Sequence, residues 1–367
     1  MRTATATKSK AAAPLAAGIS LSAGDLTTPK TAGGDQWVVL GAMRFVLAIV
    51  VMIGHLDMFD QVPPALRFIS NFGAYQAVFV FFAISGYSIS ASLERSTKGF
   101  YQRRVNRIYP TFLFGMVVAV IPFLLFGPEF DAQSYYVRAP ESAWAFVANC
   151  LMLQGIAMRG TIPTFNPCWS LQVECVAYLC APMLCKMKDR VLVAIMAISF
   201  LAYIGRGVFG DLQDPPTSMY GIATIECIWA WIAGVLIYRH MGSEKVAWSI
   251  TALIAWAMGS LTKFASDFSP AYLIGAMGIV THAPMIRVPE RLRKLALYGG
   301  DLSLSIYLIH FQIYCLVARA FPNANGWEML ACATLASFAV LHLIDRPYTA
   351  YAKRASAKHP EQLSAVT

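Results

Sequence analysis

The sequence predicts an all-α polytopic membrane protein. The chain has 367 residues, of which 57% are hydrophobic and 13% charged, and its mean hydropathy is +0.54. A soluble domain usually carries about 25% charged residues, so this composition indicates a lipid environment. Apolar runs long enough to cross a bilayer as helices recur along the chain, and short basic clusters separate them. These three observations predict the fold class.

We expect ten transmembrane helices, each a largely apolar run of about the length that crosses a bilayer. The ten runs span residues 37–58, 73–92, 109–127, 169–186, 190–206, 219–239, 246–261, 268–286, 300–320 and 327–345. An eleventh apolar segment, residues 143–157, is shorter and follows a polar stretch at residues 128–142. The length of this segment alone leaves open whether it crosses.

The distribution of Lys and Arg decides this question, because positive residues accumulate in cytoplasmic loops. With a cytoplasmic N-terminus and no crossing at residues 143–157, 22 of the 29 Lys and Arg residues face the cytoplasm. A crossing there would place the later basic clusters outside and largely remove the bias. We therefore expect both termini to be cytoplasmic. Residues 143–157 then form a short re-entrant or interfacial helix within one long outer loop, residues 128–168.

Three segments divide the chain. Residues 1–35 are rich in Ala, Thr, Ser, Gly and Lys and lack the apolar region of a signal peptide, so we expect a disordered cytoplasmic tail. Residues 36–350 form the membrane domain, and residues 351–367 form a C-terminal cytoplasmic tail. Because the apolar runs fill the middle segment, we expect any chemistry to take place in or at the membrane.

Composition and motifs exclude several other classes. The net charge of +9 does not indicate a nucleic-acid partner, because the basic residues lie in short clusters between apolar runs. The eight cysteines contain no Cys-x-x-Cys pair, so we expect packing residues rather than disulfides or a metal site. No Walker loop, zinc-protease, hydrolase or Rossmann fingerprint is present.

Two ionisable residues lie in the first expected span, in the stretch MRFVLAIVVMIGH. Arg44 and His55 are eleven residues apart, which is roughly three helical turns, so both lie on one face with a rise of roughly 16 Å between them. Ionisable residues within spans are costly, face the bundle interior and mark functional sites. A structural ion pair for Arg44 and an interfacial histidine are the alternatives.

A third buried ionisable residue, Glu174, lies in the stretch NPCWSLQVECVAYL. Asn166 is expected to cap the helix and Pro167 to be its first residue, with Trp169 at the outer interface. Glu174 then lies in the same outer half as His55. An acid there can orient or charge a histidine, or pair with an arginine; a structural hydrogen-bond network is the alternative.

Three arginines follow the second span in the stretch GFYQRRVNRIYP. Arg103 and Arg107 are four apart, and Arg104 and Arg107 are three apart, so on a helix they share one side. Three guanidinium groups there can hold a phosphorylated ligand. Alternatively, they anchor the cytoplasmic loop at lipid headgroups.

Two further polar residues lie in the ninth span. Tyr307 and His310 are three apart in DLSLSIYLIH and share a face. With Trp169 and Ser170 of the NPCWSL stretch, they are candidates for lining a substrate pocket. For His310, a buried structural histidine bonded to a neighbouring helix is the reading that the sequence favours.

These motifs occur in a fixed order. They are the Arg-x10-His pair, FFAISGYSIS, YQRRVNRIYP, WSLQVECVAYL, LSLSIYLIH and a closing DRP. Together they resemble the acyltransferase-3 family of integral membrane acyltransferases, which modify bacterial surface polysaccharides, nodulation factors and some macrolides. The resemblance covers roughly residues 36–350. The closing motif departs slightly, because Asp345-Arg346-Pro347 stands where the family commonly has Glu.

The resemblance implies about ten helices, an acyl-CoA donor on the cytoplasmic side and transfer to a hydroxyl, commonly of a sugar. It implies that Arg44 and His55 are needed for activity. It also matches Arg104 and Arg107 to the family's Arg-x-x-Arg pair, and Glu174 to the acid of its Trp-Ser-Leu-x-x-Glu motif. We expect His55 to act as the base, Arg44 to stabilise developing negative charge or hold the pantetheine arm, and Glu174 to orient His55 or hold the acceptor.

The sequence thus predicts a multi-pass O-acyltransferase of the bacterial inner (cytoplasmic) membrane, in contact with membrane lipids. Acetyl-CoA, or another acyl-CoA, is the expected donor, and a surface polysaccharide or its lipid-linked saccharide precursor is the expected acceptor. No permanently bound cofactor and no metal are expected. A transporter or flippase of a glycolipid or acylated compound is the alternative from another class. The acyl group, the acceptor, the oligomeric state and the choice between direct transfer and an acyl-enzyme stay open.

Overall fold

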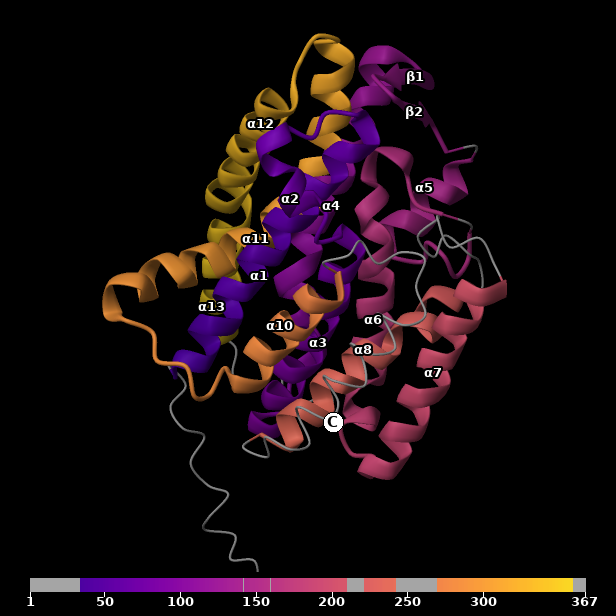
Figure 1. The fold of residues 1–367 in the computed structure, drawn as a ribbon. Helices are drawn as coiled ribbons and strands as arrows, with labels where there is room; N and C mark the ends of the chain where they lie inside the picture. The colour runs from indigo at the N-terminus through magenta and orange to yellow at the C-terminus, as the bar shows by residue number, and fades with distance from the viewer. Residues whose placement is uncertain (1–33, 141, 159, 210–220, 242–268, 359–367) are drawn as a thin grey trace, which may run out of the picture. The chain divides into compact units, whose positions relative to one another are not determined.

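The computed structural model describes residues 34–140, 142–158, 160–209, 221–241 and 269–358, and its elements are almost all helices (Figure 1). The longer helices are α1 (Asp35–Gly54), α3 (Ala74–Arg95), α4 (Phe100–Phe126), α6 (Trp169–Leu184), α7 (Asp189–Phe209), α8 (Ile222–Arg239), α10 (Ser269–His282), α11 (Glu290–Ala320), α12 (Gly326–Val340) and α13 (Arg346–Lys358). The short helices are η1 (His55–Phe59), η2 (Pro64–Leu66), α2 (Arg67–Ser70), α5 (Ala143–Cys150), η3 (Pro163–Cys168) and the π-helix η4 (Leu341–Asp345). The strands are β1 (Glu129–Ala132) and β2 (Tyr135–Arg138).

Nine of the ten expected spans coincide with helices, and the tenth, residues 246–261, lies outside the described residues. Within the described residues, six helical segments are long and apolar enough to cross a membrane. They are Asp35–Phe59, Ala74–Arg95, Phe100–Phe126, Ile222–Arg239, Glu290–Ala320 and Gly326–Ala355. The fold is therefore that of an all-α membrane protein. At the C-terminal end, α13 extends to Lys358, into the segment expected to be a tail.

The eleventh apolar segment, residues 143–157, forms only the eight-residue helix α5. Ser142 caps it, because the Ser142 hydroxyl accepts a hydrogen bond from the Ala145 amide at 3.1 Å. Eight residues span about 12 Å of helix, whereas a bilayer core is about 30 Å thick. This helix is too short to cross, as the charge distribution predicts.

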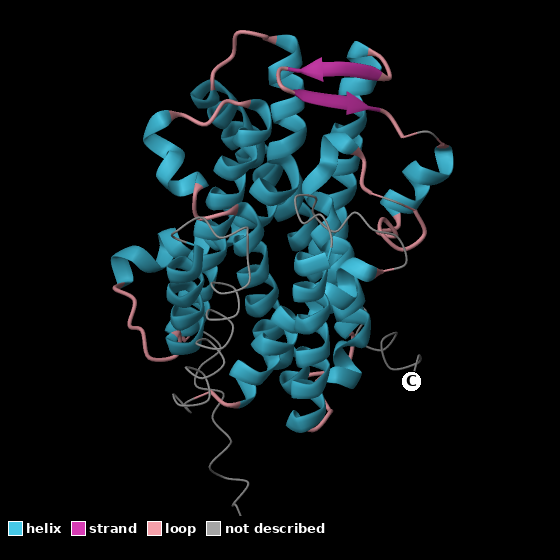
Figure 2. Ribbon diagram, turned by 45° about the vertical axis from the view of Figure 1, so that its right-hand side comes forward, coloured by secondary structure: helices cyan, strands magenta, loops and turns pink. Residues whose placement is uncertain are grey.

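The loop at residues 128–168 contains a β-hairpin that the sequence did not indicate (Figure 2). Strands β1 and β2 pair antiparallel, with Glu129 opposite Arg138, and the two side chains form an ion pair at 3.2 Å. The Gln133 amide at the turn donates to the Ala324 carbonyl at 2.9 Å. The hairpin is thereby attached to the connection between α11 and α12.

Two helix starts differ from the expected ones. The expected third span begins at residue 109, but α4 begins at Phe100, so the arginine-rich stretch forms the first two turns of this helix. The expected cap at Asn166 is wrong, because residues 163–168 form η3 and α6 begins at Trp169. Phe165 takes a non-helical conformation within η3, so a kink lies directly before Asn166, and Cys168, not Asn166, occupies the N-cap position of α6.

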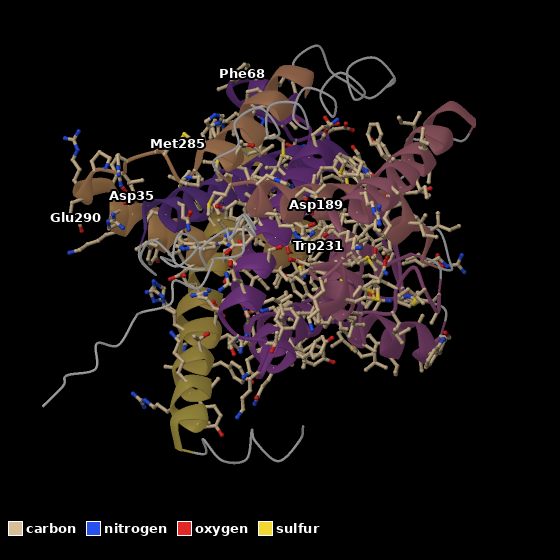
Figure 3. The ribbon with its side chains drawn as sticks, turned by 90° about the horizontal axis from the view of Figure 1, so that it is seen from below. Asp35, Phe68, Asp189, Trp231, Met285 and Glu290 are labelled. Carbon is tan, nitrogen blue, oxygen red and sulfur yellow. The ribbon has the colours of Figure 1, made fainter. Side chains whose placement is uncertain are left out.

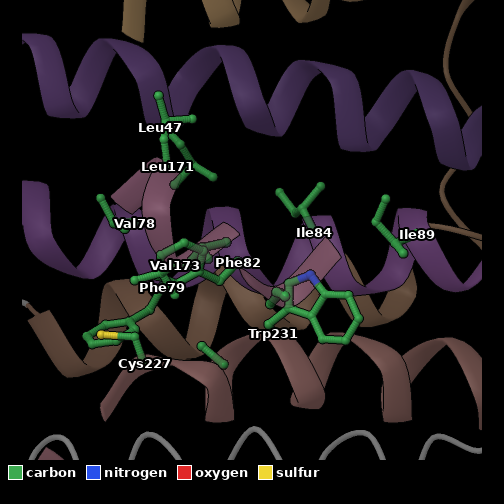
Figure 4. Close-up of a cluster of buried hydrophobic side chains, with 14 of the residues drawn as sticks. Leu47, Val78, Phe79, Phe82, Ile84, Ile89, Leu171, Val173, Cys227 and Trp231 are labelled. Carbon is green, nitrogen blue, oxygen red and sulfur yellow. The ribbon is translucent and has the colours of Figure 1, made fainter. Parts of the chain in front are cut away.

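Glycines allow α3 and α8 to approach closely. A Cβ atom on Gly86 of α3 would lie 2.0 Å from the Trp231 carbonyl oxygen of α8, and one on Gly234 of α8 would lie 1.9 Å from the Ala83 carbonyl oxygen of α3. Small residues that bring backbones together are the usual means of packing helices in membranes. Buried apolar side chains of α1, α3, α6 and α8 complete this contact, as the close-up shows (Figure 4).

Polar contacts fix the ends of α1 and α8. Asp35, the first residue of α1, forms an ion pair with Arg293 of α11, which also pairs with Glu290 at 3.0 Å (Figure 3). Arg239 at the end of α8 pairs with Asp189 at 2.7 Å and donates to the Cys185 carbonyl at 2.7 Å. The second contact satisfies a carbonyl that the end of α6 leaves free.

Candidate active site

Helix α1 positions both ionisable residues of the first span, Arg44 and His55, beside neighbouring helices. It is α-helical up to Gly54, and His55 opens the 3-10 helix η1. Roughly 16 Å of helix axis therefore separates Arg44 from His55. Both side chains are partly buried, and each meets polar groups from other parts of the chain, so α1 contributes to two levels of the site.

At the His55 end of α1, the site contains a histidine pair, His55 of α1–η1 and His310 of α11. We call this end the upper level. His55 Nδ1 lies 3.0 Å from His310 Nε2, and the ring centroids are 5.1 Å apart. His310 is fully buried, and its Nδ1 lies 2.7 Å from the Ile306 carbonyl oxygen one turn earlier. His55 Nδ1 is the nitrogen that meets His310. His55 Nε2 forms no hydrogen bond with the residues that the structure describes, so it is the nitrogen left for a substrate.

Aromatic rings surround the histidine pair. Phe311 meets His55 edge-on, with ring centroids 5.4 Å apart, and Phe59 and Tyr135 each pack on Phe311. The Tyr135 hydroxyl donates to the Pro163 carbonyl at 3.1 Å. Burial raises the pKa of this hydroxyl, which keeps it protonated as a donor. The hairpin therefore packs directly against the histidine end of α1.

The hydroxyl groups of Tyr307 and Ser170 connect α11 to α6, one helical turn before His310 in the sequence. The two hydroxyl oxygens are 2.6 Å apart, and the Tyr307 hydroxyl also reaches the Pro167 carbonyl at 3.1 Å. The Tyr307 and His310 rings are 6.4 Å apart, so these two neighbours on α11 both face the interior. Trp169 is 8% exposed and stacks on Tyr75 at 5.5 Å. Its indole is therefore enclosed by other side chains.

At the Arg44 end of α1, which we call the lower level, the site contains an arginine–glutamate cluster. We define this cluster as Arg44, Arg104, Arg107, Glu174, Ser85 and Tyr178. Glu174 of α6 accepts hydrogen bonds from the Ser85 hydroxyl of α3 at 2.8 Å and from the Tyr178 hydroxyl one turn further along α6. Glu174 forms no ion pair with the residues that the structure describes, but it interacts electrostatically with both Arg44 and Arg104.

The arginines of this cluster outnumber its carboxylate. Arg44 and Arg104 are both repelled by Arg107. The Nε atoms of Arg44 and Arg104 are buried and have no hydrogen-bond partner among the described residues. A buried donor without a partner is costly, so the arrangement fits an anionic ligand that would accept from these groups.

The three arginines of the YQRRVNR stretch divide between two roles. Arg104 and Arg107 join the cluster, but Arg103 turns to the preceding loop and donates to the carbonyls of Ser96, at 2.6 Å, and Lys98. Arg107 also interacts with Asp345 of the DRP motif. Arg103 therefore secures the loop that leads into α4, and a direct role at a ligand stays a prediction for this residue.

Sequence reasoning missed Ser85 and Tyr178. Tyr178 lies four residues after Glu174, the spacing at which two side chains on a helix meet, so this signal was available. Ser85 is one of several serines in FFAISGYSIS, and no pattern distinguishes it from the others. Within the described residues, no group of three or more His, Cys, Asp or Glu side chains could hold a metal ion.

A family model described as an acyltransferase domain, that of the acyltransferase-3 type, matches residues 38–346. The chain belongs to this family. No curated protein and no solved structure matches in the corresponding comparisons. The matched range contains the histidine pair and the arginine–glutamate cluster.

Family membership makes the protein an acyltransferase of the membrane, with an acyl donor and an acceptor as its substrates. At one end of α1, His55 is an imidazole that could accept a proton. At the other end, the partly buried Arg44 and Arg104 and the exposed Arg107 outnumber the single carboxylate of Glu174. An acyl transfer needs a proton acceptor for the attacking group and a holder for the donor, and these two levels match the two requirements.

Proposed function

We propose that this acyltransferase moves an acetyl group, or another short acyl group, from acyl-CoA to a hydroxyl of a sugar. The sugar would belong to a surface polysaccharide or its lipid-linked precursor, and the enzyme would lie in a bacterial inner membrane. The observation that carries the proposal is the two-level arrangement on α1, with His55 at a partly buried hydrogen bond to His310 and Arg44 in electrostatic interaction with Glu174.

The arginine–glutamate cluster would hold the donor. Arg104 and Arg107 lie in the first two turns of α4, and guanidinium groups bind phosphate oxygens in a bidentate manner. The phosphates of CoA would therefore lie beside them. Arg44, deeper along α1 with an unpartnered Nε, would contact the more buried part of the donor. Glu174 would offset part of their positive charge.

The histidine pair would carry out the proton transfer. The acceptor hydroxyl oxygen attacks the thioester carbonyl carbon while His55 Nε2 takes the hydroxyl proton. The new C–O bond forms, the C–S bond breaks, and the departing CoA thiolate takes the proton back from His55. The products are the sugar ester and CoA with a free thiol. An extended pantetheine arm would cover the roughly 16 Å between Arg44 and His55.

The proposed orientation follows from the basic clusters. The stretch before and within the start of α4 contains five basic residues, Arg95, Lys98, Arg103, Arg104 and Arg107. Positive residues concentrate on the cytoplasmic side, where CoA is available. The donor would then enter from the cytoplasm, and the acceptor would meet His55 toward the opposite face, where surface glycans are built.

The test uses the purified protein in detergent, with acetyl-CoA and a panel of saccharide acceptors, and follows release of the free thiol. We expect His55→Ala to lower thiol release by about 10²–10⁴-fold, because the general base is lost. The variant should still insert and purify normally. His240→Ala is the matched control: it removes a partly exposed histidine that pairs with Asp189 at 2.7 Å, and it should retain activity.

Full thiol release by His55→Ala would reject the base assignment. A wild-type protein that releases no thiol with any acceptor, but moves a glycolipid across a vesicle membrane, would support the transporter instead.

A further inference from the structure

We propose that His310 is a positioning residue for His55: it fixes the proton on His55 Nδ1 and stabilises the cation that forms when Nε2 takes a proton. The inference rests on the proposed function and deepens it. His310 touches no reacting atom in this scheme, because its contacts are with His55 and with its own helix. It would act only through the first histidine.

Proton placement follows from the acceptors around the two rings. The Ile306 carbonyl can only accept, so His310 Nδ1, at 2.7 Å from it, bears a hydrogen. In a neutral imidazole the second nitrogen is then an acceptor, and His310 Nε2 faces His55 Nδ1 at 3.0 Å. His55 Nδ1 must therefore be the donor of that bond. His55 Nε2 is left with the lone pair that a general base needs.

Burial supports the neutral form of His310. The residue is fully buried, and an isolated charge in such a place is costly unless it is paired. When His55 becomes an imidazolium, its Nδ1 proton already points at His310 Nε2. A hydrogen bond to a charged donor is stronger than one between neutral groups, so the bond strengthens as the charge develops.

Neighbouring aromatic side chains keep the His55 and His310 rings in position. Tyr314, one turn beyond His310, meets the His310 ring edge-on at 5.7 Å, and its hydroxyl donates to the Met52 carbonyl of α1 at 3.0 Å. Phe311 packs against both rings, at 5.4 Å from His55 and 6.4 Å from His310. These contacts bind α11 to the end of α1 independently of the histidine bond. Loss of that bond alone therefore need not separate the helices.

The kinetic test compares His310→Leu, His310→Gln and Tyr87→Phe in the thiol-release assay with acetyl-CoA and an acceptor that the wild type uses. Leu removes the acceptor, so we expect kcat to fall about 10²-fold or more while the KM for acetyl-CoA changes by less than about twofold. Gln offers an amide oxygen to His55 Nδ1 and should restore most of kcat. Tyr87→Phe removes a hydroxyl of α3 that contacts Gln36 and Met241, at the opposite end of α1 from His55, and should leave kcat near the wild-type value.

A His310→Leu enzyme with the kcat of Tyr87→Phe would overturn the proposal, and so would equal losses in the Leu and Gln variants. Neither result would affect the acyltransferase assignment, which the His55→Ala variant tests separately.

A second measurement, nitrogen NMR of the wild type with labelled histidine, needs no folded variant at position 310. The chain has six histidines. We expect His55 to carry its proton on Nδ1, and a proton on Nε2 instead would equally refute the positioning role.

Discussion

At the scale of single residues, Arg44 and Arg104 are the side chains that most need a ligand. Each interacts with Glu174, yet each keeps a buried Nε without a hydrogen-bond partner among the described residues. Arg107 adds a further positive charge nearby. Burying a surplus of like charges is costly. A bound polyanion would offset that cost, and the phosphates of CoA provide one.

Removal of two of these charges tests the donor role. We predict that Arg104→Ala combined with Arg107→Ala raises the Kd for acetyl-CoA by at least about tenfold, which corresponds to about 1.4 kcal/mol, because charge-assisted hydrogen bonds to phosphate are lost. The measurement is titration calorimetry of the purified protein. The chemical step at saturating donor should change less than the affinity.

The matched control is Arg95→Ala combined with Lys98→Ala. These exposed residues lie just before α4, so the control removes the same charge from the same end of the molecule. We expect it to leave the affinity for acetyl-CoA nearly unchanged. Equal affinity losses in the two double variants would indicate a general electrostatic effect, and no loss in either would favour the role of the arginines as a membrane anchor.

At the scale of elements, close contacts between helix backbones determine where the residues of the site lie. Ser85, which holds Glu174, lies next to Gly86, the residue that lets α3 approach α8. On the other side of the site, Gly41 of α1 and Gly300 of α11 approach closely, since a Cβ on Gly300 would lie 2.9 Å from the Gly41 Cα. This second contact keeps α1 and α11 close enough for His55 to reach His310.

A single methyl group at the α3–α8 contact should disturb it. We predict that Gly86→Ala destabilises the protein by about 1–3 kcal/mol, because the new Cβ meets a backbone carbonyl that cannot rotate away. Thermal unfolding in detergent would show this as a lower Tm. Gly205→Ala in α7 is the control: a Cβ there meets nothing within 4 Å, and alanine favours the helix. A Gly86→Ala protein as stable as the Gly205→Ala protein would contradict the packing argument.

At the scale of the whole molecule, the sequence predicts the helices well and their pairings less well. The spacing of Arg44 and His55 predicts a shared face because it depends only on the geometry of one helix. Their partners depend on tertiary packing: His310 is 255 residues away from His55. No local pattern could show that it, rather than Glu174, would meet the ring.

The hairpin and the role of Arg103 were missed for related reasons. Strands β1 and β2 have only four residues each, too few for alternation to be recognised. They are stabilised by contacts with distant segments, such as the bond from Gln133 to the Ala324 carbonyl. Arg103 shares a helix face with its neighbours in sequence, but loop carbonyls at Ser96 and Lys98 are nearer partners.

The account depends on the donor lying along α1, with its phosphates at the arginines and its thioester at the histidine pair. Electron cryo-microscopy of the protein bound to a non-hydrolysable acetyl-CoA analogue measures this directly. We predict phosphate density in contact with Arg104 and Arg107, and the carbonyl carbon within about 5 Å of His55 Nε2, close enough for a hydroxyl hydrogen-bonded to His55 to attack it. Phosphates bound at the hairpin end, or a carbonyl group that lies on the lipid-facing side of α1, would contradict it.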